Sequence, residues 1–253
     1  AYQEQLDAVL ASGEDLDLHL SPAPVTKAGD GTSVAGPRVI QQKQPGLYAV
    51  AWHPIGGQPD LNTLCALSDA LADMDGTEMR LAPDETAYII NLTGSEATKI
   101  LALTADGAQT LFETSVSCIG GATCQVGMRD SQGLLNACVD AVRRAGILDG
   151  ALPQVHISGC PSSCGTHQTG VLGFRGASRL VDGKPQAGFL LFVGGNAHQG
   201  QETMGREVGV LLEKDVPAYL IDLGRTVAAS GQDFNTWFKE NPKGPDQIAE
   251  KYL

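Results

Sequence analysis

The sequence has few basic residues and no cluster of them. Its 253 residues include 17 Lys and Arg against 29 Asp and Glu, which gives a formal net charge of −12. Recognition of nucleic-acid phosphates depends on clustered Lys and Arg side chains. The scarcity of positive charge therefore argues against a nucleic-acid-binding protein, and it also argues against broad docking of an acidic partner.

Long apolar runs are missing as well. No stretch approaches the roughly 20 apolar residues of a membrane-spanning helix, and the N-terminal segment AYQEQLDAVLASGEDLDL lacks the pattern of a secretory signal. We therefore expect a soluble, cytoplasmic protein without a membrane partner. The hydrophobic content of 42% is ordinary for a globular protein that buries a core. The first residue is Ala, which fits either removal of Met or a piece of a longer chain.

The first 45 residues are predicted to be a tail and a linker. Residues 1–20 begin with an amphipathic pattern of Leu6, Val9 and Leu10, which predicts a tail helix. Residues 21–45 are rich in Pro, Gly, Ser and Thr and show no sustained period. This composition indicates a linker, or an extended arm that crosses another surface.

Residues 46–105 predict the order β-α-β-β-α. The segment LYAVAWHPI favours a strand, GGQP a turn, and Asp60 is a suitable N-cap for the helix that follows. The apolar side chains on one face of that helix are Leu61, Leu64, Leu67, Leu71 and Met74. Two short strands, TEMRLA and TAYIINL, and a helix over residues 95–103 complete the unit. We expect one antiparallel sheet backed by helices.

Residues 106–253 predict a mixed α/β domain, so that the whole chain is of the α+β class. A strand ends at Cys118, a helix runs from Ser131 to Ala145 and stops at Gly146, and the buried strand QVHIS leads to Cys160. The helix residues expected to face inward are Leu134, Leu135, Cys138, Val139 and Val142. A hairpin around DGKPQ follows, and then helices near residues 205–212, 216–229 and 234–239.

Four of the six cysteines form two pairs in Gly- and Ser-rich loops. Five residues separate Cys118 from Cys124, and three separate Cys160 from Cys164. Four thiolates suit zinc or an iron-sulfur cluster, and the five-residue gap is long for zinc. A structural or redox-disulfide arrangement stays open. The remaining two, Cys65 and Cys138, lie on or near apolar helix faces and are predicted to be small buried hydrophobic residues.

These residues carry a resemblance to a known family. The two pairs, the segment SGCPSSCGTHQTGVLGFRG and the glycines and Asn of a later GGN element resemble the sirohaem and 4Fe-4S nitrite and sulfite reductases, over about residues 46–240. The resemblance is to the second, C-terminal half of that family. It implies a ferredoxin-like half-domain at residues 46–105, followed by a domain at 106–253 that binds the cluster and sirohaem.

The resemblance also implies roles for single residues. The cluster ligands would be Cys118, Cys124, Cys160 and Cys164. Cys164 would be the catalytic residue as well, because it would bridge the cluster to the sirohaem iron as its axial ligand. Other cofactor contacts would come from Ser162, Gly165 and Asn196. The family usually has Asn where this chain has Ser162, and Ala82, Glu85 and Thr86 also depart from its pattern.

The activity implied is the six-electron reduction of nitrite or sulfite, with a low-potential donor such as ferredoxin. In the family the substrate-binding Arg and Lys come mostly from the first half. At the position where the first half of the family has an Arg on its first strand, this chain has the segment AWHPI, which contains His53. The chain is therefore expected to be a fragment, or to pair with a second half-chain, another subunit or itself.

From the sequence alone, two other functions stay possible, and the roles of four side chains are undecided. The alternatives are a precorrin-type oxygenase of the same fold and a non-catalytic iron-sulfur module for electron transfer. Arg129, Arg175 and Arg179 are candidates for contacts with sirohaem carboxylates, against the alternative of solvated surface arginines. His167 is a candidate proton donor.

Overall fold

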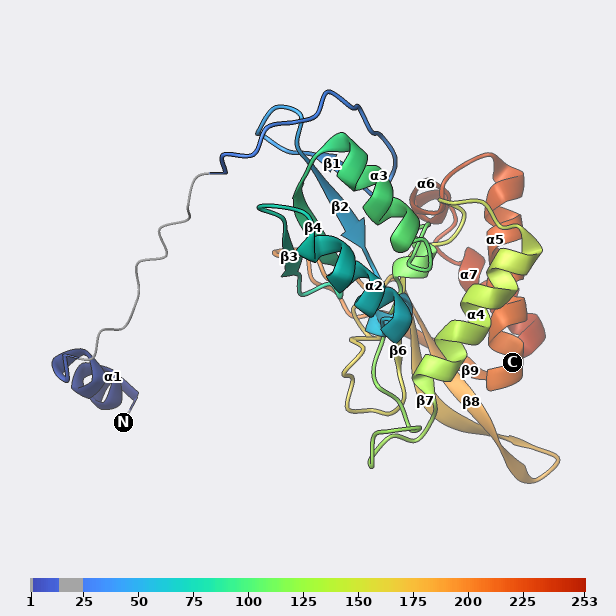
Figure 1. Ribbon diagram of the computed structural model, residues 1–253. Coiled ribbons are helices and arrows are strands. Elements are labelled where there is room, and N and C mark those ends of the chain that lie inside the picture. The colour runs from blue at the N-terminus through green and yellow to red at the C-terminus, as the bar shows by residue number, and fades with distance from the viewer. Residues whose placement is uncertain (1, 14–24) are drawn as a thin grey trace.

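A computed structural model describes residues 2–13 and 25–253 of the chain. Figure 1 shows two sheets with their helices and, apart from them, the N-terminal helix α1 (Tyr2–Ala11). The prediction of a tail helix is confirmed for these residues, none of which is buried, whereas residues 14–20 of that prediction lie outside the described part. Within the described residues, no helix combines the length and the apolar character needed to cross a membrane.

The first sheet is antiparallel and has four strands. Its order is β1 (Val39–Gln41), β2 (Tyr48–Trp52), β4 (Ala87–Leu92) and β3 (Glu78–Leu81). Helices α2 (Leu61–Ala72) and α3 (Gly94–Leu103) pack together, and the buried residues of both belong to the same core as those of β2 and β4. The predicted β-α-β-β-α order is confirmed. Strand β1 is additional and comes from the segment that was expected to be a linker or an extended arm.

Helix α2 begins where the sequence indicated, but its apolar face is only partly buried. The side chain of Asp60 accepts hydrogen bonds from the N–H groups of Asn62 and Thr63, as expected of an N-cap. Leu67 is buried, whereas Leu61, at the start of the helix, is 73% exposed. Cys65 is exposed, so the prediction of a buried thiol there is wrong. It lies two residues before Leu67, about 200° around the helix, and therefore faces away from the core.

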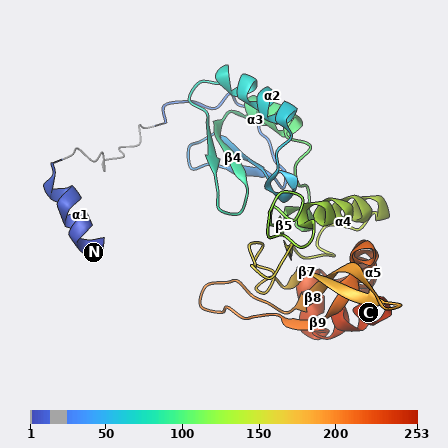
Figure 2. The ribbon, with the colours of Figure 1, turned by 90° about the horizontal axis from the view of Figure 1, so that it is seen from below.

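The second sheet is mixed. Its order is β5 (Val116–Ser117), β6 (Val155–Ser158), β7 (Leu172–Val181), β8 (Lys184–Val193) and β9 (Arg206–Leu212). The first three strands are parallel and the last two are antiparallel to their neighbours. Helices α4 (Ser131–Ala145), α5 (Val216–Ser230), α6 (Phe234–Glu240) and α7 (Gly244–Ala249) contribute buried residues to its core. In Figure 2, β5 and α4 lie between the first sheet and the β7–β8 hairpin.

Helix α4 confirms its prediction at both ends and along its buried face. The Asp130 side chain caps the N–H of Gly133, and Gly146 ends the helix with φ 65°. All five residues expected to face inward are buried. Cys138 lies in the hydrophobic core, and burial raises the pKa of its thiol.

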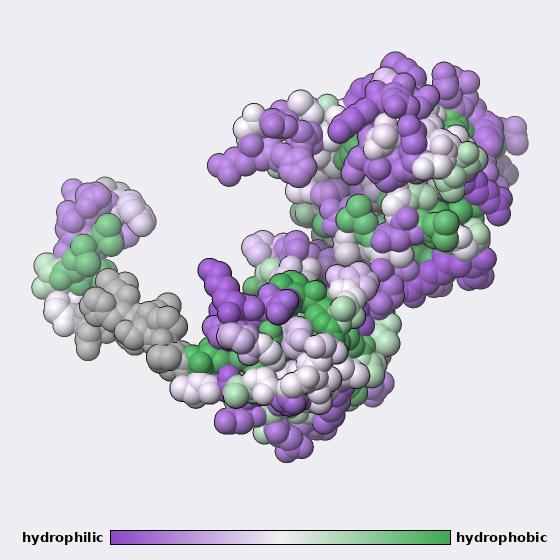
Figure 3. Space-filling view, turned by 90° about the horizontal axis from the view of Figure 1, so that it is seen from above, coloured by the Kyte–Doolittle hydropathy of each residue, from purple (hydrophilic) through white to green (hydrophobic). Residues whose placement is uncertain are grey.

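The segment around residues 205–212 was predicted to be helical and is strand β9. It pairs with β8, whose outer edge would otherwise leave backbone N–H and C=O groups unpaired. Val208 and Val210 are β-branched and two residues apart, which suits a strand. On the face seen from above, Figure 3 shows hydrophobic residues among hydrophilic ones.

Candidate metal centre

The two cysteine pairs follow neighbouring parallel strands. Cys118 comes directly after β5, and Cys160 comes two residues after β6. In the register of these strands, Ser117 lies opposite Ile157. Because parallel strands end at the same edge of a sheet, both cysteine loops start from one edge.

The two loops are joined by hydrogen bonds at that edge. The N–H of Gly159 donates to Sγ of Cys118 at 3.1 Å, which links the first cysteine of one loop to the residue before Cys160. In return, the N–H groups of Met128 and Arg129 donate to the carbonyl of Gly159 at 3.2 and 3.0 Å. The first cysteine loop is therefore fastened to the start of the second.

The second loop has a special backbone around Cys164. Ser163 and Thr166 have φ of 66° and 51°, a left-handed conformation that is uncommon for residues other than Gly. The N–H of Gly165 donates to Oγ of Ser158 at 3.1 Å, and a Cβ at position 165 would lie 2.1 Å from the carbonyl oxygen of Ile157. The chain after Cys164 thus returns close against β6, and only Gly fits there.

The four thiols differ in exposure. Cys160 is buried, Cys118 and Cys124 are half-buried and Cys164 is exposed, and all six cysteines of the chain are free thiols. Among residues 2–13 and 25–253, no three His, Cys, Asp or Glu side chains lie together in the arrangement of a metal site. The donor types nevertheless fit an iron-sulfur cluster, since soft thiolates are its usual ligands and the loops that carry them are already fastened together.

The structure brings the GGN element beside the second cysteine loop. A Cβ on Gly195 would lie 2.5 Å from the carbonyl oxygen of Gly170, so the two segments touch through their backbones. Asn196 pairs with Thr203 in an isolated antiparallel bridge, and its Oδ1 accepts the N–H of His198 at 2.9 Å. Of the other expected cofactor contacts, Ser162 is exposed and Gly165 is buried.

The three candidate arginines have partners within the protein. Arg179 donates to the carbonyls of Val210 and Tyr252 at 3.0 and 2.6 Å and so fastens the C-terminus to β9. Arg129 Nε donates to a carbonyl of β7 at 2.8 Å. Arg175 lies over the ring of Phe192, with its guanidinium carbon 5.5 Å from the ring centroid. Arg179 is therefore a structural residue.

His167 and His53 are both buried. Burial, assisted by the charge of Arg175, lowers the pKa of His167 to about 4, so its imidazole is neutral at pH 7. Nδ1 of His53 lies 3.0 Å from Oγ1 of Thr86, and burial lowers its pKa as well. A neutral His53 supplies no positive charge at the position where the resemblance would place an Arg.

One contact of the centre was not predicted. Oγ of Ser131, the first residue of α4, lies 3.1 Å from Sγ of Cys118 and 2.8 Å from its carbonyl oxygen. From the sequence, Ser131 indicated only the start of a helix. Nothing in the sequence reports a contact with a sulfur 13 residues away.

Comparisons with known proteins agree on one family, although no family model matches the chain. The chain is 31% identical over 198 residues to a ferredoxin–nitrite reductase of Synechococcus elongatus, covering 73% of this chain and 37% of the relative. It is 26% identical to sulfite reductase [ferredoxin] 1 of Mycolicibacterium paratuberculosis, covering 81% and 37%. The solved structure of the NirA protein of Mycobacterium tuberculosis matches with a TM-score of 0.64 at 25% identity, covering 79% of this chain and 38% of that one.

These matches confirm the α+β fold and the resemblance on which the cysteine loops were interpreted. The chain spans a little more than a third of the length of these relatives. It belongs to the family of nitrite and sulfite reductases.

Proposed function

We propose that this chain is the cluster- and sirohaem-bearing half of a six-electron nitrite or sulfite reductase. The observation that carries the proposal is the hydrogen bond from Gly159 to Sγ of Cys118, which fastens the two cysteine loops together at one sheet edge. The ligands of a 4Fe-4S cluster would be Cys118, Cys124, Cys160 and Cys164. The relatives reported above are named as nitrite or sulfite reductases, which favours this function over the oxygenase.

Cys164 is proposed to connect the two cofactors. It is the exposed thiol of the four, whereas Gly165, the next residue, is buried with its backbone close against Ile157 of β6. A flat macrocycle can approach a sulfur that is exposed in this way. When bound, a cluster and a sirohaem that share one thiolate supply a covalent route for electrons to the haem iron. Gly165, Ser162 and Asn196 are the proposed neighbours of the sirohaem.

The substrate and the partners follow from the relatives and from the charge of the chain. The nitrite reductase of Synechococcus elongatus is named for ferredoxin, so a low-potential donor of that kind is proposed here. Binding of an oxyanion requires positive charge, whereas the net charge is −12 and burial keeps His53 neutral. We therefore propose that a second half, on another chain or subunit, completes the anion site.

Metal analysis after anaerobic reconstitution with iron and sulfide tests the cluster. We expect four irons per chain in the native protein, and their loss in Cys118→Ser and Cys160→Ser. Cys65→Ser is the matched control, because Cys65 is an exposed thiol outside both loops. Stoichiometric zinc in the native protein, or full iron retention in Cys118→Ser, would contradict the proposal.

A further inference from the structure

We propose that Ser131 is a positioning residue for the cluster: its hydroxyl donates a hydrogen bond to the Cys118 sulfur and raises the reduction potential of the cluster. This inference rests on the proposed function, because it requires a cluster bound to Cys118. It names the ligand whose sulfur accepts an additional hydrogen bond, Cys118, and the helix that supplies the donor, α4.

Sγ of Cys118 has two polar neighbours. Oγ of Ser131 lies 3.1 Å from the sulfur, and the N–H of Gly159 lies at the same distance. Ser131 is fully buried, so water does not compete for its hydroxyl. Among the described residues, no other sulfur of the two cysteine pairs has a side-chain hydroxyl partner, which makes Cys118 the tuned ligand.

The chemistry of the ligand decides the direction of this hydrogen bond. A free thiol can donate its own proton to Ser131, whose hydroxyl then donates to the Cys118 carbonyl at 2.8 Å. A metal-bound thiolate has no proton, so an oxygen 3.1 Å away makes a favourable contact only as a donor. Cluster binding would therefore turn the hydroxyl toward the sulfur, or share its proton between sulfur and carbonyl.

The hydroxyl, and not the helix dipole, is the source of the effect. Ser131 is the first residue of α4, a helix of 15 residues, but the carboxylate of Asp130 caps the same end and offsets the dipole there. Reduction adds negative charge to the cluster and its sulfurs. A hydrogen-bond donor next to a ligand sulfur stabilises the reduced state more than the oxidised state. We therefore expect the native potential to be higher than that of a cluster without this hydroxyl.

The experiment measures the midpoint potential of the reconstituted cluster by EPR-monitored redox titration. In Ser131→Ala the potential is expected to shift to a more negative value while four irons are retained, because Gly159 still donates to the sulfur. Ser117→Ala is the matched control. Ser117 is also a buried Ser next to Cys118, but its hydroxyl donates to the carbonyl of Cys118 and not to the sulfur.

Ser131→Thr keeps the hydroxyl and is expected to keep the native potential, whether or not the Ala variant retains its cluster. The resonance Raman band of the Fe–S(Cys) stretch is expected to move in Ser131→Ala and to stay in place in Ser117→Ala. Equal potentials in the native and Ser131→Ala proteins, or a lowered potential in Ser131→Thr, would overturn the inference. Absence of a 4Fe-4S cluster from the native protein would instead overturn the proposed function.

Discussion

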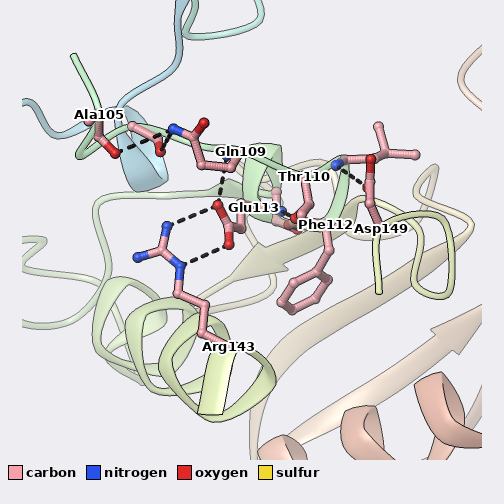
Figure 4. Close-up of polar contacts among 10 residues, drawn as sticks. Ala105, Gln109, Thr110, Phe112, Glu113, Arg143 and Asp149 are labelled. Carbon is pink, nitrogen blue, oxygen red and sulfur yellow. Dashed lines mark hydrogen bonds and ion pairs between the residues drawn. The ribbon is translucent and has the colours of Figure 1, made fainter. Parts of the chain in front are cut away.

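The guanidinium group of Arg143 on α4 donates two hydrogen bonds to the carboxylate of Glu113. Nε donates to Oε1 at 2.8 Å and Nη2 donates to Oε2 at 2.9 Å (Figure 4). Oε2 also accepts the N–H of Gln109 at 2.7 Å. The Glu113 side chain is only 6% exposed. This pair therefore connects the segment between the two sheets to the helix whose first residue contacts Cys118.

Glu113→Gln is expected to destabilise the protein by about 2 kcal/mol, the usual cost of losing a hydrogen bond to a charged group. In the native protein, the N–H groups of Arg143 and Gln109 donate to carboxylate oxygens. In the variant, the amide NH₂ group would face some of these donors and could not accept from them. Chemical denaturation measures the free energy of unfolding. Glu78→Gln is the control, since the Glu78–Arg80 ion pair has a similar distance of 2.9 Å but is more than half exposed. Equal losses in the two variants would contradict the role given to Glu113.

The Glu113 carboxylate is also expected to make the folded protein less stable in acid. Burial alone would raise the pKa of Glu113, but the hydrogen bonds from Arg143 and from backbone N–H groups outweigh burial and lower it below its ordinary value of 4.5. The stabilisation is thus complete above pH 4.5 and is lost as the pH falls through the lower, folded-state pKa. This part of the acid dependence is expected to disappear in Glu113→Gln.

His167 is expected to make the free energy of unfolding depend on pH in a higher range than Glu113 does. Its pKa falls from 6.5 to about 4 on folding, through burial and the charge of Arg175. The groups facing it are the hydroxyl of Ser163, at 3.3 Å, and the ring of Phe192, at 4.8 Å between centroids. The stabilisation is full above pH 6.5 and declines toward pH 4, with a slope of at most about 1.4 kcal/mol per pH unit.

His167→Gln is expected to make the free energy of unfolding less dependent on pH over this range, because Gln does not titrate. His53, which is buried, and His156, which is half-buried, also have lowered pKa values, so some slope remains. His198→Gln, at an exposed position, is the control for the substitution itself. An unchanged slope in His167→Gln would show that this imidazole is equally protonated in the folded and unfolded states.

Gly165→Ala is expected to cost about 2 kcal/mol or more of stability, as overpacking does in a tight site. The new methyl group would lie 2.1 Å from the carbonyl oxygen of Ile157, which belongs to the β6 backbone and cannot move alone. Ser162→Ala, at an exposed position of the same loop, should change the free energy of unfolding by no more than about 0.5 kcal/mol. Thermal or chemical denaturation of the cofactor-free protein checks both values.

Cys164→Ser tests the proposed bridge between the cofactors. A Ser oxygen binds iron less well than a thiolate, so this variant is expected to shift the sirohaem absorption and to abolish turnover together. Cys118→Ser should disturb the haem only through loss of the cluster. A native haem spectrum and spin state in Cys164→Ser would contradict the bridge and leave Cys164 as an ordinary cluster ligand.

Local features were readable from the sequence because they depend on near neighbours in the chain. Gly146 marks the end of α4, and the spacing of its apolar residues marks the buried face, since both signals lie within a few turns of the helix. The spacing of the two cysteine pairs is equally local. Together with the segment around the second pair, it was enough to predict the family to which the chain belongs, whereas the type of centre stays a prediction.

Long-range relationships were decided by the tertiary structure. Strand β9 is extended because β8 offers a free edge, although its sequence was interpreted as helical. Leu61 and Leu67 both belong to the apolar face predicted for α2, yet only packing exposes the first and buries the second. The hydrogen bond from Gly159 to Cys118 spans 41 residues and depends on the parallel register of β5 and β6. Register and packing arise from the whole set of buried contacts, so no local pattern of residues encodes them.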